Sequence, residues 1–434
     1  MKRQKIAIVG TGISGLTAAR HLHKHHDVTL FESSSWIGGH TLTVDVDLPN
    51  DKQSVDMGFI VFNDRTYPNF ISMLDQLGVA SQPAPMTFSV RCDQTDLEYR
   101  GADLPGLFAQ KRNLLRPKFY GLLRGILKFN RIGQQLMHST DHQLTIRQFF
   151  QQNKFPKSFY DYYFLPMGSA IWSCPQSTFE HFPIRFIAEF YHHHGLLSVK
   201  NRPQWRVVCG GSKSYVEPLV HPFRDRIYLN TAVVHVQRQA DHVKVATSQQ
   251  IQDFDHVVFA CHADQAMKLL GDQVTDLERE VLGAFPYEPN EAVLHVDDSV
   301  LPKRSRAWAS WNYLLPEDRT SKASLTYCMN ILQSLDSDQT YCVTLNNTDR
   351  IDPKKVIHKI QFSHPIFDQR RKPMQDRHAE LLGPNRTSYC GAYWGNGFHE
   401  DGVVSGLAVA QQFADRVPVI TKAAQTSDVL QQDV

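Results

Sequence analysis

The sequence predicts an α/β protein that begins with a Rossmann-like, dinucleotide-binding unit, and the signals for this unit lie close together. Residues 5–9 (KIAIV) are a short apolar run that is typical of a buried parallel strand. A G-x-G-x-x-G pattern follows at once, and residues 16–22 continue as a helix. A second strand is expected at residues 28–31, with the acidic Glu32 at its end. Strand, glycines, helix, strand and acid together predict one βαβ unit.

Each glycine of the pattern has its own expected task. Gly10 permits a tight turn, Gly12 lets the backbone approach a pyrophosphate, and Gly15 lets the helix pack closely on the strand. Ser14 lies at the expected helix start, where free N–H groups and the helix dipole favour phosphate. Glu32 can accept hydrogen bonds from a ribose hydroxyl.

A second glycine pair, Gly38 and Gly39, follows Glu32 and would let the chain fold back over a permanently held cofactor. The alternative is an ordinary loop before a strand. The whole arrangement resembles the FAD-binding opening of the flavin amine oxidase and carotenoid desaturase superfamily. In that superfamily an arginine usually follows the pair, whereas this chain has His40, which donates fewer hydrogen bonds to a phosphate.

Composition suggests a two-domain globular protein in a reducing compartment. The chain has 434 residues, 42% hydrophobic and 21% charged, and its net charge of +2 gives no indication of a nucleic-acid partner. Seven cysteines without CxxC spacing are typical of free thiols, and no export signal is recognised, which favours the cytoplasm. The 21 histidines lack the partners of a recognisable metal site, so no metal is expected. The oligomeric state stays open.

Nucleotide-domain signals recur in three separated regions, which predicts a discontinuous domain. An FAD-binding domain is expected from residues 1–82, 207–285 and 363–420. An α+β substrate domain is expected from residues 83–206 and 286–362. The polar residues 421–434 are expected to form a flexible tail.

The resemblance extends over nearly the whole chain and is strongest to a bacterial branch of predicted NAD/FAD-binding proteins linked to modified fatty acids. It implies that Gly58 approaches the flavin and that the backbone of Val233 bonds the adenine. It further implies that Gly391 and a Gly402–Val403 turn close over the flavin ring. A helix from Gly406 would then direct its N-terminus at the flavin carbonyl O2, where negative charge develops on reduction.

Two departures from the superfamily pattern bear on the reaction. The acid that often follows the glycine equivalent to Gly391 is replaced by Ala392. The lysine that amine oxidases place near flavin N5 is absent from the candidate strand, residues 290–296. The second departure argues against simple amine oxidation. No cysteine lies in residues 394–398, where a flavin thioether would be expected, so the FAD should be non-covalent.

Candidate catalytic residues lie in the glycine-rich segment 396–402 (NGFHEDG). His399 and Glu400 could form a proton shuttle or tune the flavin. The alternative is that these residues cap a helix, with the carboxylates satisfying backbone N–H groups.

Candidate substrate residues come from the aromatic insertions and from the end of the chain. Trp311 and Tyr393 could wall an apolar cavity, or they could be ordinary core. Asn312 and Asn330 are expected on strands, where a buried amide needs a partner, and they are candidate pocket residues.

Residues 104–140 contain seven lysines and arginines but no acidic residue. Within them, residues 119–136 combine apolar side chains at helical spacing with basic side chains on another face. This pattern is typical of a helix on an anionic membrane surface, although a core-facing helix with a solvated basic side is an equal alternative.

The leading hypothesis is an FAD-dependent oxidoreductase that removes hydride from an apolar, fatty-acyl or lipid-linked substrate, in the cytoplasm or on the inner membrane face. The alternatives are a flavin amine oxidase, a redox-neutral double-bond isomerase, and a non-catalytic flavin-binding partner of a membrane enzyme.

Overall fold

The expected βαβ unit forms the centre of a parallel sheet. The structure is a computed structural model that describes residues 3–48, 51–138, 141, 143–198, 202–318 and 320–413. β1 (Lys5–Val9) pairs with β2 (Asp27–Phe31), and α1 (Ile13–Leu22) connects them. The sheet order is β10-β2-β1-β14-β20, and every pair is parallel. The three partner strands come from far along the chain: β10 (Ile227–Tyr228), β14 (His256–Phe259) and β20 (Thr387–Tyr389).

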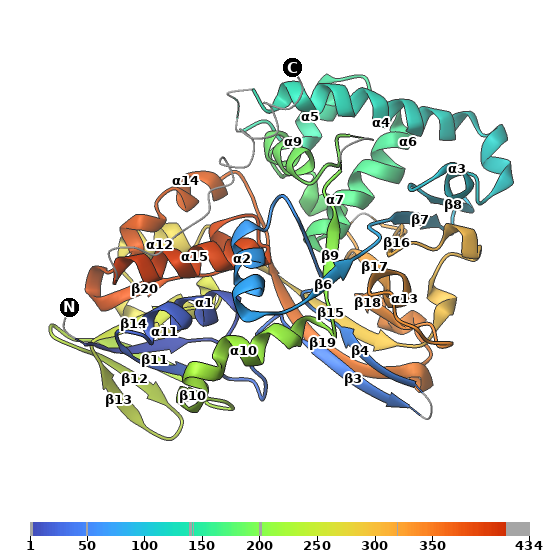
Figure 1. Cartoon of the computed structure of the whole chain (residues 1–434). Coiled ribbons are helices and arrows are strands. Elements are labelled where there is room, and N and C mark those ends of the chain that lie inside the picture. The colour runs from blue at the N-terminus through green and yellow to red at the C-terminus, as the bar shows by residue number, and fades with distance from the viewer. Residues whose placement is uncertain are drawn as a thin grey trace, which may run out of the picture.

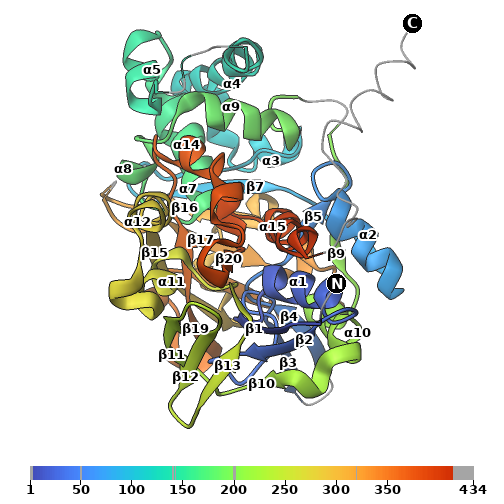
Figure 2. The same cartoon turned by 90° about the vertical axis from the view of Figure 1, so that its left-hand side faces the viewer.

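Both faces of this sheet are covered, which explains why β1 is a continuous apolar run rather than an alternating one. Ile6 and Ile8 face a core shared with α1 and α15 (His399–Gln412). Ala7 and Val9 face a second core on the opposite side. That second core is shared with α11 (Ala263–Leu270), α12 (Asp276–Leu282), β11 (Val233–Arg238), β12 (Val243–Thr247) and β13 (Ile251–Phe254). Figure 2 shows α1 and α15 side by side over the sheet.

The packing of α15 on α1 corrects two expectations. The helix begins at His399 rather than at Gly406, and Gly402 and Val403 lie within it rather than in a turn. A Cβ on Gly402 would lie 2.7 Å from Ile13 Cγ2, and one on Gly406 would lie 2.4 Å from the Ser14 carbonyl oxygen. These glycines therefore serve close helix–helix contact, which sequence alone does not distinguish from a turn.

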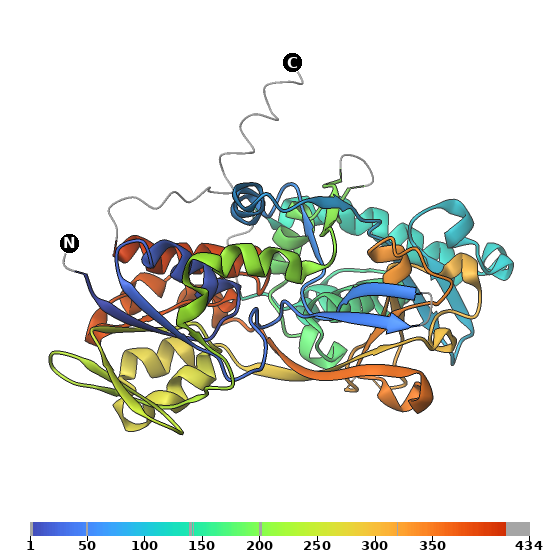
Figure 3. The same ribbon diagram turned by 60° about the horizontal axis from the view of Figure 1, so that its bottom comes forward.

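A seven-stranded mixed sheet forms the other half of the molecule, to the right in Figure 1. Its long strands β15 (Tyr287–His295) and β19 (Val356–Pro365) are antiparallel neighbours, drawn in gold and orange in Figure 3. The order continues through β18 (Cys342–Leu345), β17 (Ser324–Cys328), β16 (Trp311–Leu314), β7 (Phe88–Cys92) and β8 (Leu97–Arg100). The strand expected at residues 290–296 corresponds to most of β15.

An aromatic helical unit lies above this second sheet in Figure 1. It comprises α4 (Pro117–Leu136), α5 (Ile146–Gln152), α6 (Lys157–Phe159), α7 (Leu165–Trp172), α8 (Gln176–Phe179) and α9 (Ile184–His193). Trp172 lies in its core among phenylalanine rings, for example 4.8 Å from that of Phe190 by ring centroids. The shorter elements include β3 (Thr43–Leu48), β4 (Asp51–Asp56), β5 (Val61–Asn63), α2 (Pro68–Leu77), β6 (Ser81–Pro83), α3 (Leu104–Leu107), β9 (Trp205–Val208), α10 (Val216–Val220), α13 (Met329–Leu332) and α14 (Arg371–Gln375).

The α/β class is confirmed, whereas the limits of the two domains stay a prediction. The expected flexible tail, residues 421–434, lies outside the described residues. Among the helices that the structure describes, none has the length and apolar character needed to cross a bilayer.

Replacing Gly406 by alanine should destabilise the protein, because the new methyl group would overlap the α1 backbone. The expected loss is about 1–3 kcal/mol of unfolding free energy, the usual cost of overpacking, and it opposes the gain in helix propensity. Denaturant unfolding measures it. Gly101→Ala is the control, because its nearest neighbour, the Phe88 carbonyl oxygen, lies 3.7 Å away. Equal stability of the two variants would contradict this account of the α1–α15 contact.

Candidate functional site

Two glycine loops meet at the N-terminus of α1. Gly12 and Gly38 form an isolated parallel bridge, and a Cβ on Gly39 would lie 3.0 Å from the Gly12 Cα. Gly10 has a φ of +106°, in the region that favours glycine, and a Cβ on Gly15 would lie 2.4 Å from the Gly10 carbonyl oxygen. The tasks expected for Gly10 and Gly15, a tight turn and close packing, agree with this geometry.

Gly12 differs from the other two because nothing in the protein requires a glycine there. Its φ is −63°, which any residue adopts, and no atom lies within 4 Å of an added Cβ. Gly12 is the N-cap of α1, and no side chain caps the helix. The first N–H groups of α1, including that of Ser14, therefore have no side-chain acceptor and are available to an anion. This open cradle fits a pyrophosphate group.

Glu32 connects the first glycine loop to the end of β2. Its carboxylate accepts hydrogen bonds from the Thr11 backbone N–H at 2.9 Å and from the Thr11 hydroxyl at 2.6 Å. It also accepts one from the Ser34 N–H at 2.9 Å. The Thr231 N–H donates to the Glu32 carbonyl oxygen at 2.7 Å, so Val233, at the start of β11, lies close along the chain. Glu32, which is expected to bind the ribose, thus lies near Val233, which is expected to bind the adenine.

His40 belongs to a group of three partly exposed imidazoles. Its ring lies 5.5 Å from that of His364 on β19 and 6.2 Å from that of His262, and it stacks on Phe362 at 4.7 Å. Burial lowers the pKa of His40 and of His262 to about 4, and that of His364 to about 3. All three rings are therefore neutral at pH 7, so each has one N–H donor and one acceptor nitrogen. The acceptor nitrogen of His364, Nδ1, already receives the Asn290 amide at 3.0 Å.

The sequence analysis missed His262 and His364. His262 lies three residues after the last residue of the buried strand β14, and the carboxyl ends of parallel strands share the edge at which the glycine loops lie. That signal was present in the sequence. His364 was not predictable, because its approach to His40 depends on the pairing of β19 with β15. No group of three or more His, Cys, Asp or Glu residues among those described is arranged to hold a metal ion.

His399, the first residue of α15, is buried against the second glycine loop. Its Nε2 lies 2.7 Å from the Tyr215 hydroxyl and 3.2 Å from the Thr41 hydroxyl, and its ring stacks on Phe59 at 3.5 Å. Burial holds the pKa of His399 well below its usual range, so the imidazole is neutral. This arrangement makes His399 a link between α15 and the loop that carries Gly38 to Thr41.

Gly58 belongs to the same assembly. A Cβ on Gly58 would lie 2.1 Å from the His40 carbonyl oxygen, and the Phe59 N–H donates to that oxygen at 2.8 Å. The glycine thus permits a close backbone contact with His40, next to His399.

Glu400 caps α2. Its carboxylate accepts hydrogen bonds from the Asn69 N–H at 3.0 Å, the Phe70 N–H at 2.9 Å and the Asn69 amide at 2.7 Å. This matches the capping alternative rather than the proton shuttle, because the acid is engaged with backbone donors at a helix N-terminus.

Gly391 and Val403 are held by contacts with other parts of the protein. The Gly391 N–H donates to the Ser405 hydroxyl at 2.9 Å, and Val403 is buried in the core with α1.

The two asparagines expected to line a pocket have protein partners. Asn312 on β16 accepts from the Ser89 hydroxyl and the Ala309 N–H and donates to the carbonyls of Ala309 and Thr326. Asn330 lies in α13 rather than on a strand, where it bonds the Gln339 carbonyl and the Tyr341 N–H. Both amides stabilise the protein's own backbone, and the strand expectation for Asn330 was wrong because the chain turns into a helix after Cys328.

The two aromatic candidates differ in their surroundings. Tyr393 is buried, with its ring 5.1 Å from that of Phe285 on the side of the parallel sheet away from α15, which matches the core alternative. Trp311 is partly exposed and packs edge-on against Tyr327.

The aromatic helical unit contacts the segment just before α15. The ring of Phe190 on α9 stacks on that of Phe398 at 5.3 Å. The guanidinium of Arg371 lies 3.9 Å from the Phe186 ring centre and 4.8 Å from that of Phe367, and it bonds the Asn396 side chain. Burial lowers the pKa of Arg371 to about 10, which leaves it charged at pH 7. The segment 396–398 is thus fixed between apolar rings and one buried cation.

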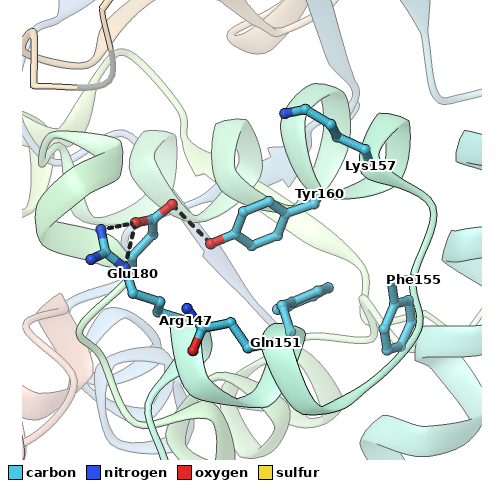
Figure 4. Close-up of a pocket in the computed structure, with 7 residues that line it drawn as sticks. Arg147, Gln151, Phe155, Lys157, Tyr160 and Glu180 are labelled. Carbon is cyan, nitrogen blue, oxygen red and sulfur yellow. Dashed lines mark hydrogen bonds and ion pairs between the residues drawn. The ribbon is translucent and has the colours of Figure 1, made fainter.

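A cavity of about 340 Å³ in the helical unit is a weaker candidate (Figure 4). Arg147 and Tyr160 both point toward Glu180, and its carboxylate accepts hydrogen bonds from both, at 2.6 and 2.9 Å. These polar groups therefore already bond one another, and none of the candidate residues above lines the cavity.

Replacing Tyr215 by phenylalanine should lower stability by about 1–3 kcal/mol, because the buried His399 and Thr41 would lose a shared partner. Affinity for the cofactor should fall as well, since the Tyr215 hydroxyl anchors the second glycine loop. Denaturant unfolding and flavin titration measure the two effects. The control is Tyr228→Phe, because Tyr228 is exposed. If Tyr215→Phe has the same stability and flavin affinity as this control, the hydrogen bonds of Tyr215 to His399 and Thr41 are unimportant.

Comparisons with known proteins agree with this geometry. The family model described as flavin containing amine oxidoreductase matches residues 13–300. No curated protein sequence matches the chain. Among solved structures, a CLA-producing fatty acid isomerase from P. acnes has a TM-score of 0.67 at 15% identity, covering 95% of this chain and 99% of that one. A putrescine oxidase bound to putrescine has a TM-score of 0.67 at 14% identity, covering 96% and 100%.

Cyclohexylamine oxidase from Brevibacterium oxydans is similar in the same way, with a TM-score of 0.65 at 14% identity and coverage of 96% and 100%. At such low identity these structures show the shared fold, and the family match extends over more than half of the chain. The superfamily expected from the glycine pattern, its FAD and its oxidoreductase class are thereby confirmed. The chain belongs to the flavin-containing amine oxidoreductase family.

Proposed function

We propose that this FAD-dependent oxidoreductase removes hydride from an apolar, fatty-acyl or lipid-linked substrate and works on a membrane surface. The observation that carries the substrate proposal is the contact between the aromatic helical unit and segment 396–398, through Phe190 and Phe398. Apolar rings line this contact, and the two acidic side chains in the first turn of α15, Glu400 and Asp401, already accept hydrogen bonds from backbone N–H groups. Such surroundings suit an alkyl chain better than a cationic amine.

The residues that would hold FAD are those of the two glycine loops and the strand ends. Gly12 and the N-terminus of α1 would bind the pyrophosphate, and Glu32 and Val233 would bind the ribose and adenine. The neutral imidazoles of His40, His262 and His364 would donate hydrogen bonds where relatives use an arginine. When bound, the flavin supplies the acceptor for the hydride.

The paired strands β15 and β19 contain no buried lysine, which argues against an amine substrate. β15 contains no lysine, and Lys359 on the paired strand β19 is exposed. The buried amide of Asn290 on β15 instead donates to His364 Nδ1 at 3.0 Å. The fatty acid isomerase with this fold acts without net oxidation, as its name implies, which makes double-bond isomerisation the second candidate.

Gly12→Val should leave the protein folded but colourless. The cradle has room for the valine side chain, and this side chain would then occupy the space that the pyrophosphate needs. Unfolding of the apoprotein should match that of the wild-type apoprotein, unlike Gly406→Ala. Absorbance of the purified protein measures the flavin, and full flavin content would show that the pyrophosphate lies elsewhere.

In the wild type, acid precipitation should release intact FAD into the supernatant, whereas flavin retained in the pellet would disprove non-covalent attachment.

Anaerobic flavin bleaching tests the substrate proposal. Detergent-dispersed fatty acids and phospholipids should bleach the flavin, and a panel of mono- and diamines should not. Bleaching by amines alone would overturn the proposal. A shifted double bond in recovered lipid, without bleaching, would identify the isomerase instead.

A further inference from the structure

Exposed apolar side chains are concentrated at one edge of the helical unit. Five of the eight large apolar side chains that are strongly exposed in the described residues lie between residues 104 and 127: Leu104, Leu114, Leu115, Tyr120 and Leu127. Single exposed leucines are normal on a protein surface, whereas such a concentration indicates a contact surface. In Figure 1 this edge is the upper right, around α3 and the beginning of α4.

The apolar side of α4, which the sequence analysis expected to contact a membrane, faces the protein instead. Phe119, Leu122 and Phe129 of that helix are buried against the protein. The helix glycines explain how closely it packs, because a Cβ on Gly125 would lie 2.3 Å from the Phe159 Cβ. The expected apolar stripe is therefore a core contact.

What faces solvent is a mixed ridge. Tyr120, Arg124, Leu127 and Arg131 are exposed, and their spacing of four, three and four residues places them on one face of α4. Leu127 keeps 64% of its surface exposed. This ridge alternates apolar and basic side chains along about three turns of helix.

A short tip extends the ridge beyond the helix start. Residues Lys111–Leu115 form a 3₁₀ turn, and Leu115 at its end is 86% exposed. The Tyr120 hydroxyl donates to the Leu114 carbonyl oxygen at 2.9 Å, which fixes the tip against the first turn of α4. The tip is thus held in place with its leucines outward.

The charge of this edge is positive and uncompensated. Lys111, Lys118, Arg124 and Arg131 are exposed and have no ion pair or hydrogen-bond partner among the described residues. Residues 104–138 contain no aspartate or glutamate. Lys128, by contrast, donates to the Lys154 carbonyl oxygen and lies over the Phe155 ring, so it is engaged with the protein.

We propose that this lipid-facing edge docks on an anionic bilayer, and we define it by Lys111, Leu114, Leu115, Lys118, Tyr120, Arg124, Leu127 and Arg131. The leucines enter the boundary between headgroups and acyl chains, while the basic side chains reach the lipid phosphates. The proposal extends the membrane location proposed above, and it does not depend on which substrate the flavin oxidises.

Co-sedimentation of the flavin-loaded full chain with phosphatidylcholine vesicles, with and without phosphatidylglycerol, tests the charge. Binding should require phosphatidylglycerol and weaken with salt. Changing Lys118, Arg124 and Arg131 together to glutamine should weaken it roughly 100-fold, since each basic residue near the surface contributes about fivefold. The matched control changes three exposed lysines elsewhere, Lys268, Lys354 and Lys359, to glutamine and should bind like the wild type.

Removal of the leucines tests insertion. Leu115→Ser with Leu127→Ser should weaken binding at least about tenfold, because two largely exposed leucines would no longer enter the bilayer. The control is Val234→Ser with Ile251→Ser, which removes two other strongly exposed apolar side chains, 56% and 67% exposed, from another surface. Equal effects of the two pairs would overturn the proposed edge.

If the wild-type protein does not bind anionic vesicles at low salt, the proposal is overturned, and an acidic protein becomes the partner expected at this edge. An unchanged flavin spectrum shows that each variant is folded. The glutamine variant should still be bleached by detergent-dispersed lipid. If no lipid bleaches the flavin of the wild-type protein, although this protein still binds anionic vesicles, the substrate proposal is disproved and the membrane-docking proposal is not affected.

Discussion

The close approach of α1 and α15 is the constraint on which the rest of the structure depends. Close contacts at Gly15, Gly402 and Gly406 leave no room for a side chain at these three positions, so that α1 packs tightly on the Gly10 turn and α15 packs tightly on α1. This packing brings the start of α15 to the end of the molecule where the glycine loops converge. His399 then reaches Tyr215 and Thr41, and Glu400 reaches the first N–H groups of α2. The open cradle at Gly12 and the segment 396–398 that precedes α15 are thereby fixed relative to each other.

The candidate site is electrostatically unusual because its polar side chains are mostly neutral. Burial lowers the pKa of His40, His262 and His364, so these imidazoles carry no charge at pH 7. Neutral donors can hold a cofactor's polar groups without adding positive charge to the site. Arg371, the one buried lysine or arginine among the residues that the structure describes, lies between two phenylalanine rings and bonds Asn396, so its charge fixes a segment of chain.

The sequence predicted the fold best where signals were local. The βαβ unit, its glycines and Glu32 follow one another within a few tens of residues, and the structure places them as expected. It predicted less where one residue type serves two purposes. Gly402 suggested a turn and Gly406 a helix start, but both serve helix packing within α15. Glu400 suggested chemistry but caps α2, and Asn330 suggested a pocket but supports a neighbouring turn. His364 could not be found because its partners are set by strand pairing across the chain.

The strand order also sets a problem for the chain during synthesis. β1 is made first, yet its partner β14 ends at residue 259, and β20 follows only at residues 387–389. At about 5–20 residues per second, the ribosome needs tens of seconds to deliver these segments. Throughout that time the apolar strand β1 has an unpaired edge and uncovered faces, which makes it prone to aggregation. Because α15 is made after β20 and completes the core over α1, the cofactor site can close only once these residues have left the ribosome, and the need for protection from aggregation should end there.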